Sequence, residues 1–161
     1  MNTGQMMITL AAIMLLSLVI LRVTKGFLYT DDVLIDSKLG VLGVSIATSI
    51  MEEATGKAFD ENSDSGTISG LANLTKIGPE SGENYANFDD FDDYNGLVKY
   101  DNTMPVATYK IECRVRFVNP ADLDSYSSSA TWHKKLDVRV TTPTSQDTIE
   151  MSTIYSYFYY R

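Results

Sequence analysis

The chain has 161 residues and a formal net charge of −8, with 13 Lys and Arg against 21 Asp and Glu. This length suits one modest domain with an appendage. The acidic balance argues against direct nucleic-acid binding, because phosphates attract clusters of Lys and Arg. A single cysteine, Cys113, rules out an intramolecular disulfide, and a single histidine, His133, leaves most zinc sites and catalytic triads short of ligands. We therefore expect no enzyme and no obligatory cofactor.

The first stretch of the chain is apolar: no side chain from Met1 to Leu21 is charged, and Met6–Leu21 is densely hydrophobic. As a helix it spans roughly 31 Å, close to the hydrocarbon thickness of a bilayer. Its Leu, Ile and Val side chains favour insertion by roughly 3–5 kcal/mol. A cleaved secretory signal fits less well, because no Lys or Arg precedes the run and no A-x-A-like site follows it. Residues 1–25 are therefore predicted to be a membrane segment or part of a filament core.

A helix that is apolar on every face needs lipid or other helices around it. The small side chains of Ala11, Ala12 and Ser17 allow a second helix to approach closely. The residues predicted to pack in such a core are Met6, Met7, Ile8, Leu10, Ala11, Ala12, Ile13, Leu15, Leu16, Leu18, Val19, Ile20 and Leu21.

Residues 26–59 are predicted to form the amphipathic half of the same long N-terminal helix (residues 1–59). Gly26 is expected to interrupt it, and Asp31 or Asp32 to restart it by capping. Glu52 and Glu53 are expected to be surface charges. The polar run 60–66 should end the helix. An apolar stripe at spacings of three and four needs a sheet to cover it; its members are Leu39, Leu42, Ile46, Ile50, Ala54 and Phe59.

The remainder divides into an acidic region rich in Gly, Asn and Asp (residues 60–105) and a C-terminal part (residues 106–161) with alternating patterns. Strict alternation gives a strand one buried and one solvated face, as in an antiparallel sheet. We predict an α+β fold in which the C-terminal half of a long, protruding N-terminal helix packs on an antiparallel β-meander. The expected strands are Thr67–Leu71, Gly96–Tyr100, Tyr109–Phe117, Leu136–Val140 and Ile149–Tyr160, the last after a turn at Pro143–Asp147.

The segment Phe88–Gly96 is the best candidate for a binding site. Its carboxylate and amide oxygens suit calcium, although the EF-hand register fails because Phe91 falls at the first ligand position. In the alternative, Phe88 and Phe91 pin the loop onto the core and leave the carboxylates in solvent. The candidate calcium ligands are Asp89, Asp90, Asp92, Asp93 and Asn95.

The tail Tyr155–Arg161 is aromatic on both faces of the expected strand. Aromatic side chains are favoured at the centres of interfaces. The tail is therefore expected either to contact another subunit or to pack within its own chain, and both alternatives stay open.

The order of elements and a short motif resemble type IV pilins and pseudopilins. Gly4-Gln5 before Met-Met-Ile-Thr-Leu resembles a prepilin-peptidase junction, and the segments Ile50–Glu61 and Phe88–Gly96 resemble pilin-like bacterial proteins. The resemblance implies a structural subunit of an extracellular filament at the cell surface. Such a subunit spans the inner membrane once before assembly, then packs with copies of itself through the pilus assembly machinery. Some pseudopilins also bind calcium in a loop of this region. Roles in motility, adhesion, DNA uptake and secretion all stay open.

Two features of the chain depart from the family pattern. The first implies either that register in a filament rests on packing and hydrogen bonds or that this is an atypical or tip subunit. Family members usually carry Glu at the fifth mature position, where this chain has Thr9 counted from Gln5, or Gln5 counted from Met1. The leader Met1–Gly4 has no basic residue, and Arg22 and Lys25 follow the apolar run; taken alone, this charge pattern favours a cytoplasmic globular part. The alternatives are a single-pass membrane-anchored binding module or a minor pseudopilin of a secretion system.

Overall fold

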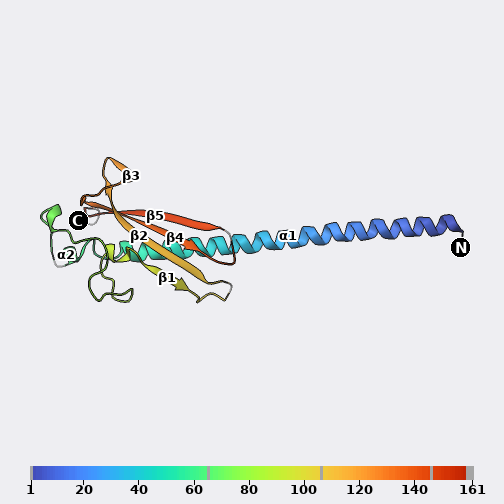
Figure 1. Cartoon of the computed structure of the whole chain (residues 1–161), viewed down its shortest axis with the longest axis horizontal. Helices are drawn as coiled ribbons and strands as arrows, with labels where there is room; N and C mark the ends of the chain where they lie inside the picture. The colour runs from blue at the N-terminus through green and yellow to red at the C-terminus, as the bar shows by residue number, and fades with distance from the viewer. Residues whose placement is uncertain (1, 65, 106, 146, 159–161) are drawn as a thin grey trace. The chain divides into compact units, whose positions relative to one another are not determined.

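The computed structural model describes residues 2–64, 66–105, 107–145 and 147–158 (Figure 1). The chain divides into two compact units, Met1–Leu39 and Gly40–Arg161, and each is described by itself. Helix α1 (Thr3–Thr55) makes up the described part of the first unit and opens the second. The elements that follow are α2 (Glu61–Asp64), the 3-10 turns η1 (Leu71–Asn73) and η2 (Asp92–Tyr94), and strands β1–β5.

Helix α1 is unbroken, so the predicted interruption at Gly26 and the restart at Asp31 or Asp32 are wrong. A glycine inside a helix costs only about 1 kcal/mol relative to alanine, which the neighbouring helical hydrogen bonds tolerate. The helix ends at Thr55, four residues before the predicted end at Phe59. At this end the backbone N–H of Gly56 donates to the carbonyl oxygens of Glu52 and Glu53, at 3.1 and 3.2 Å.

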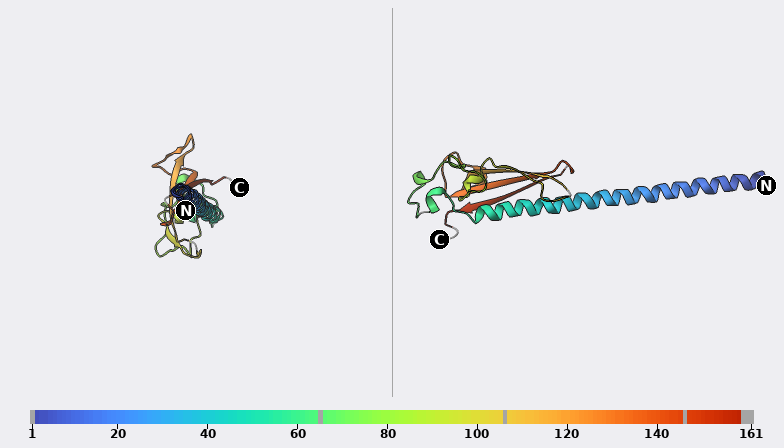
Figure 2. Two further views of the ribbon diagram at one scale, coloured as in Figure 1. Left: turned by 90° about the vertical axis from the view of Figure 1, so that its right-hand side faces the viewer. Right: turned by 90° about the horizontal axis from the view of Figure 1, so that it is seen from below.

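The antiparallel meander is confirmed, in the order β1-β2-β4-β5. Figure 2 shows its strands lying beside the C-terminal end of α1. Strand β3 pairs only with the end of β2, where Val118 lies opposite Tyr126. This short, polar strand was not predicted, and the predicted strand Thr67–Leu71 is absent because Leu71 begins a 3-10 turn instead. The strands are β1 (Val98–Asp101), β2 (Tyr109–Asn119), β3 (Asp122–Tyr126), β4 (His133–Thr141) and β5 (Thr148–Ser156).

Within the second unit, α1 packs on one face of the sheet. Gly43 makes this close approach possible, because a Cβ at that position would overlap the side chain of Ile149. The alternation seen in the sequence places the inward side chains of β2 and β4 in the core. The buried members of the helix in this unit are Gly43, Ile46, Ala47, Ile50 and Ala54, and the buried apolar members of the two strands are Tyr109, Ile111, Cys113, Val115, Val118, Leu136, Val138 and Val140.

The predicted helix stripe is largely confirmed: Leu39, Ile46, Ile50, Ala54 and Phe59 are buried. Leu42 is only half-buried, and the stripe passes through the unpredicted Gly43 and Ala47 instead. Fully burying each large aliphatic side chain contributes about 1.5–3 kcal/mol, so these positions carry much of the stability of the unit.

A second core of aromatic side chains forms around Tyr157. Its ring packs edge-on against Phe59 at 5.5 Å and stacks on Trp132 at 4.9 Å, and its hydroxyl accepts a 2.7 Å hydrogen bond from the backbone N–H of Ile68. Tyr155 likewise packs within the chain, 5.7 Å from the ring of Phe59. These two side chains therefore pack within the chain, and a contact of the tail with another subunit stays a prediction. Residues 159–161 of the tail lie outside the described residues.

Candidate functional site

The apolar segment predicted to polymerise is fully exposed. Every described residue from Asn2 to Lys38 is exposed, and Met7 exposes 73% of its surface. By length and composition, α1 is able to cross a membrane, and none of its most apolar stretch is buried. Burial of such surface is favourable by about 25 cal/mol per Å², so exposure of this segment to water is unfavourable.

The hydroxyl groups of the apolar segment are bonded within the helix. Thr9 Oγ1 donates to the Met6 carbonyl oxygen, Ser17 Oγ to that of Ile13, and Thr24 Oγ1 to that of Ile20, each at 2.9 Å. A hydroxyl that already donates to a carbonyl of its own helix adds little free-energy cost when the surroundings offer no water. The segment can therefore face lipid or apolar side chains without leaving these donors unpaired.

The predicted processing junction, Gly4-Gln5, lies in the first turn of α1, where the Gln5 N–H donates to the Asn2 carbonyl oxygen at 2.9 Å. Both residues are exposed. Cleavage at this junction stays a prediction.

The acidic segment Phe88–Gly96 matches neither the predicted calcium site nor the predicted solvated loop. Phe88 and Phe91 are buried, as the second alternative expected, but so are Asp90, Asp92 and Asp93, each at most 1% exposed. The expectation of solvated carboxylates is therefore wrong for these three and holds only for Asp89, which is exposed. Buried carboxylates need hydrogen bonds or cations, so each one has a specific structural requirement.

Asp90 and Asp93 cap the 3-10 turn η2 in a reciprocal manner. Asp90 Oδ1 accepts from the N–H groups of Asp92 and Asp93 at 2.8 and 3.1 Å, and Asp93 Oδ2 accepts from those of Asp89 and Asp90 at 3.0 and 3.1 Å. Asn95 Oδ1 accepts from the Val115 N–H at 3.1 Å, which ties the turn to β2.

Asp92 belongs to a buried ion triad with Lys134 and Asp60. The Lys134 ammonium donates to Asp92, to Asp60 Oδ1 at 3.0 Å and to the Phe59 carbonyl oxygen at 2.8 Å, and its side chain is fully buried. Burial raises the pKa of Asp92 to about 8, against the opposing effect of the Lys134 charge. The sequence analysis missed this triad, although Lys134 stands in the apolar phase of the β4 alternation, and a charge in that phase signals a buried partner.

Glu53 was expected to be a surface charge but holds the acidic segment onto α1. Its carboxylate accepts hydrogen bonds from the hydroxyls of Tyr85 and Tyr94 at 2.6 and 2.7 Å. Burial and this carboxylate raise the pKa of both phenols. Glu52, by contrast, is exposed as predicted.

The five predicted calcium ligands do not converge. Among the described residues, the acidic side chains whose oxygens come within 4.8 Å of one another are Glu80, Glu83 and Asp93, so only Asp93 of the predicted set takes part. Calcium binding by this part of the chain stays a prediction, and the geometry changes the residues on which it would depend.

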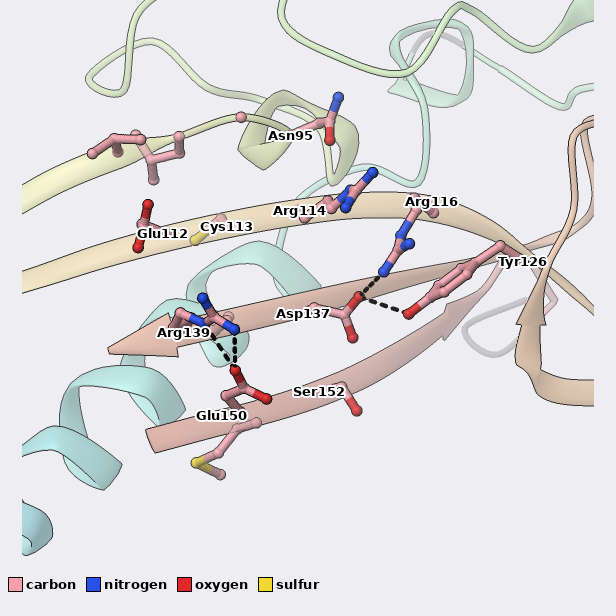
Figure 3. Close-up of a pocket in the computed structure, with 15 residues that line it drawn as sticks. Asn95, Glu112, Cys113, Arg114, Arg116, Tyr126, Asp137, Arg139, Glu150 and Ser152 are labelled. Atoms are coloured by element: carbon pink, nitrogen blue, oxygen red, sulfur yellow. Dashed lines mark hydrogen bonds and ion pairs between the residues drawn. The ribbon is translucent and has the colours of Figure 1, made fainter. Parts of the chain in front are cut away.

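A groove of about 720 Å³ lies on the other face of the sheet (Figure 3). Its charges pair across the strands: Arg116 with Asp137 at 2.8 Å, and the Arg139 Nε with Glu150 at 2.8 Å. Tyr126 donates to Asp137 at 3.1 Å. Such pairs stabilise neighbouring strands, which accounts for these residues without a ligand.

Cys113 borders this groove and is buried. Burial raises the pKa of its thiol to about 12, with the Glu53 charge adding to the effect. A thiol in this state is a poor nucleophile, because the thiolate is the reactive form.

Comparison with protein-family models, with curated proteins and with solved structures finds no match. The architecture is consistent with a pilin-like fold, in which a long apolar N-terminal helix continues into a part that packs on an antiparallel sheet.

Proposed function

We propose that this chain is a structural subunit of an extracellular filament, a pilin-like protein rather than an enzyme. The observation that carries the proposal is the complete exposure of a membrane-length apolar helix on a chain whose other unit has its own buried core. A surface of this kind needs an apolar partner. In the proposal, lipid is that partner before assembly, and copies of the same segment are the partner afterwards.

Exchange of lipid for neighbouring helices has little hydrophobic driving force, because both surroundings are apolar. Close packing has to supply it, and small side chains at the contact permit that packing. Ala11, Ala12 and Ser17 lie in the exposed stretch and offer such a contact. A membrane anchor has no comparable need for small side chains, which separates the two leading interpretations.

Charged residues beyond the apolar run could set the register between neighbouring subunits. They would take the place of the Glu that family members usually carry at the fifth mature position. Arg22 and Lys25 are exposed, as are Asp31, Asp32 and Asp36. At 1.5 Å per residue, the basic pair lies roughly 9–21 Å along the helix from the acidic set. A neighbouring copy shifted by such a distance would bring opposite charges together.

The test uses two substitutions with opposite chemistry at one position. Ala12→Leu keeps the segment apolar but fills the close contact, so membrane insertion should persist while filaments in sheared cell-surface material disappear from negative-stain micrographs. Ala12→Asp should abolish filaments as well. Ala121→Asp, in the exposed turn after β2, is the matched control and should leave filaments intact.

If the wild-type chain appears only as a monomer in detergent-solubilised membrane, the filament proposal is wrong and the membrane-anchored binding module replaces it. If Ala12→Leu subunits still polymerise, close packing at this position is not the basis of assembly.

A further inference from the structure

Three carboxylates approach one another at the edge of the acidic segment. Glu80, Glu83 and Asp93 each place one oxygen within 4.8 Å of the others. Asp93 is completely buried, whereas Glu80 and Glu83 are half-buried. Like charges at this separation repel one another, so the arrangement requires a compensating positive charge or proton.

Two of these side chains also have buried oxygens with no protein partner among the described residues. They are Asp93 Oδ1 and Glu80 Oε2, and the neighbouring Asp90 Oδ2 is in the same state. The hydrogen bonds of the turn occupy the other Asp93 oxygen, Oδ2, which accepts two backbone N–H groups. Buried carboxylate oxygens are normally bonded, so unpartnered ones in one cluster favour either a proton or a cation beside them.

The nearby ammonium groups are committed elsewhere. Lys134 donates to Asp60, Asp92 and a backbone carbonyl oxygen. The Lys99 Nζ lies over the ring of Tyr85, 4.0 Å from its centre. Among the described residues, neither lysine forms an ion pair with the acidic cluster, so its charge is balanced by something other than these side chains.

We propose that Glu80, Glu83 and Asp93 bind a divalent cation of the calcium class, with the free Asp90 oxygen beside them. Oxygen-only ligands from carboxylates, placed on a loop, suit Ca²⁺ better than a transition metal, which prefers nitrogen or sulfur. The turn at Gly82 has φ +99°, a conformation that favours glycine, and it connects Glu80 to Glu83. This inference does not depend on the filament proposal.

The competing explanation is a shared proton. Burial, helped by the Glu83, Asp90 and Asp93 carboxylates, raises the pKa of Glu80 to about 7. A protonated Glu80 would relieve part of the repulsion without any metal. The two explanations differ at pH 8, where the proton is released and a cation remains.

The experiment uses the full chain in detergent micelles at pH 8. Thermal melts are recorded with EDTA, with CaCl₂ and with MgCl₂, and Tb³⁺ luminescence is excited through tyrosine. Tyr94 follows Asp93 directly and Tyr85 lies 6.3 Å from it, ring to ring, so bound Tb³⁺ should emit. We expect Ca²⁺ to raise the melting temperature above that in EDTA and to displace Tb³⁺.

Glu80→Gln and Glu83→Gln should weaken Ca²⁺ binding by about tenfold or more. Glu80→Gln should also raise the melting temperature in EDTA, because it removes a repelling charge, so loss of the Ca²⁺ response in this variant does not reflect misfolding. Glu52→Gln makes the same change on an exposed carboxylate and should leave Ca²⁺ binding unchanged. Melting temperatures that are the same in Ca²⁺ and EDTA, or Tb³⁺ emission that survives both cluster substitutions, would overturn the proposal.

Discussion

The polar side chains of the two units are hydrogen-bonded in opposite ways. In Met1–Leu39, from Asn2 to Lys38, the side chains are exposed and the hydroxyls of the apolar stretch bond back to their own helix. In Gly40–Arg161, carboxylates and an ammonium group are buried and bonded between distant parts of the chain. The first unit therefore depends on its surroundings for stability, whereas the second depends on its own internal pairs. The predictions below test each half of that contrast.

The largest effect should come from placing a charge in the first unit. Ala12→Asp inserts a carboxylate at an apolar position, which costs about 2.5–3.5 kcal/mol at the centre of a membrane helix. Each subunit of a filament would bear a comparable penalty, so we expect assembly to be lost completely. Circular dichroism and the urea midpoint of the second unit should stay unchanged; a shifted midpoint would break the contrast between the units.

The next effect belongs to the second unit. Lys134→Met leaves Asp60 and Asp92 buried without their cation, and breaking a buried ion pair costs about 3–5 kcal/mol. The free energy of unfolding in urea, measured on the full chain in micelles, should fall by that amount. Lys135→Met is the matched control: its partner Asp124 is exposed, at 3.3 Å, so the loss should stay below about 1 kcal/mol. Equal losses in the two variants would show that the triad has no special role.

A smaller effect is expected at Glu53, which holds two tyrosine hydroxyls. Hydrogen bonds to a charged group contribute about 1.5–3 kcal/mol each, and Gln retains one acceptor. Glu53→Gln should therefore lower the free energy of unfolding by about 1–3 kcal/mol in urea titrations. Glu52→Gln, one residue away on the exposed side, should have no measurable effect. A silent Glu53→Gln would mean that the acidic segment holds to α1 by its aromatic rings alone.

A further effect is a pH dependence of the second unit in EDTA. Burial raises the pKa of Asp92 to about 8, of Glu80 to about 7 and of Asp93 to about 6, all above their ordinary values. The folded state then holds protons that the unfolded state releases, so stability should fall as the pH rises from 5 to 8. The urea midpoint measures this slope, and Glu80→Gln should flatten it. A midpoint that rises over this range would contradict the pKa directions.

Periodic patterns predicted the fold because each repeats over many residues. The alternation of β2 and the helix stripe around Ile46 and Ile50 are confirmed, since burial on one face imposes those periods directly. The predicted interruption at Gly26 is wrong because a long helix overrides a local preference of about 1 kcal/mol. Strand β3 has a mostly exposed, polar pattern, so no periodic signal marks it.

The composition of the chain located the candidate binding region but did not identify the carboxylates that come together in it. A run of aspartates indicates oxygen ligands, yet it does not show which carboxylates fold inward. Glu80 and Glu83 lie in a turn separated from the run by several residues, and only the folded chain brings Asp93 to them. The Lys134 triad joins residues 74 and 42 positions apart, a separation that no local spacing encodes.

The hydroxyls of Thr9, Ser17 and Thr24 have a further consequence. Because each bonds to a carbonyl of its own helix, none of these bonds has to break when the surroundings of the segment change. Under the proposed function, a subunit could then leave a dismantled polymer, return to the bilayer and be used again. The same helix could then serve in both surroundings with its own hydrogen bonds unchanged.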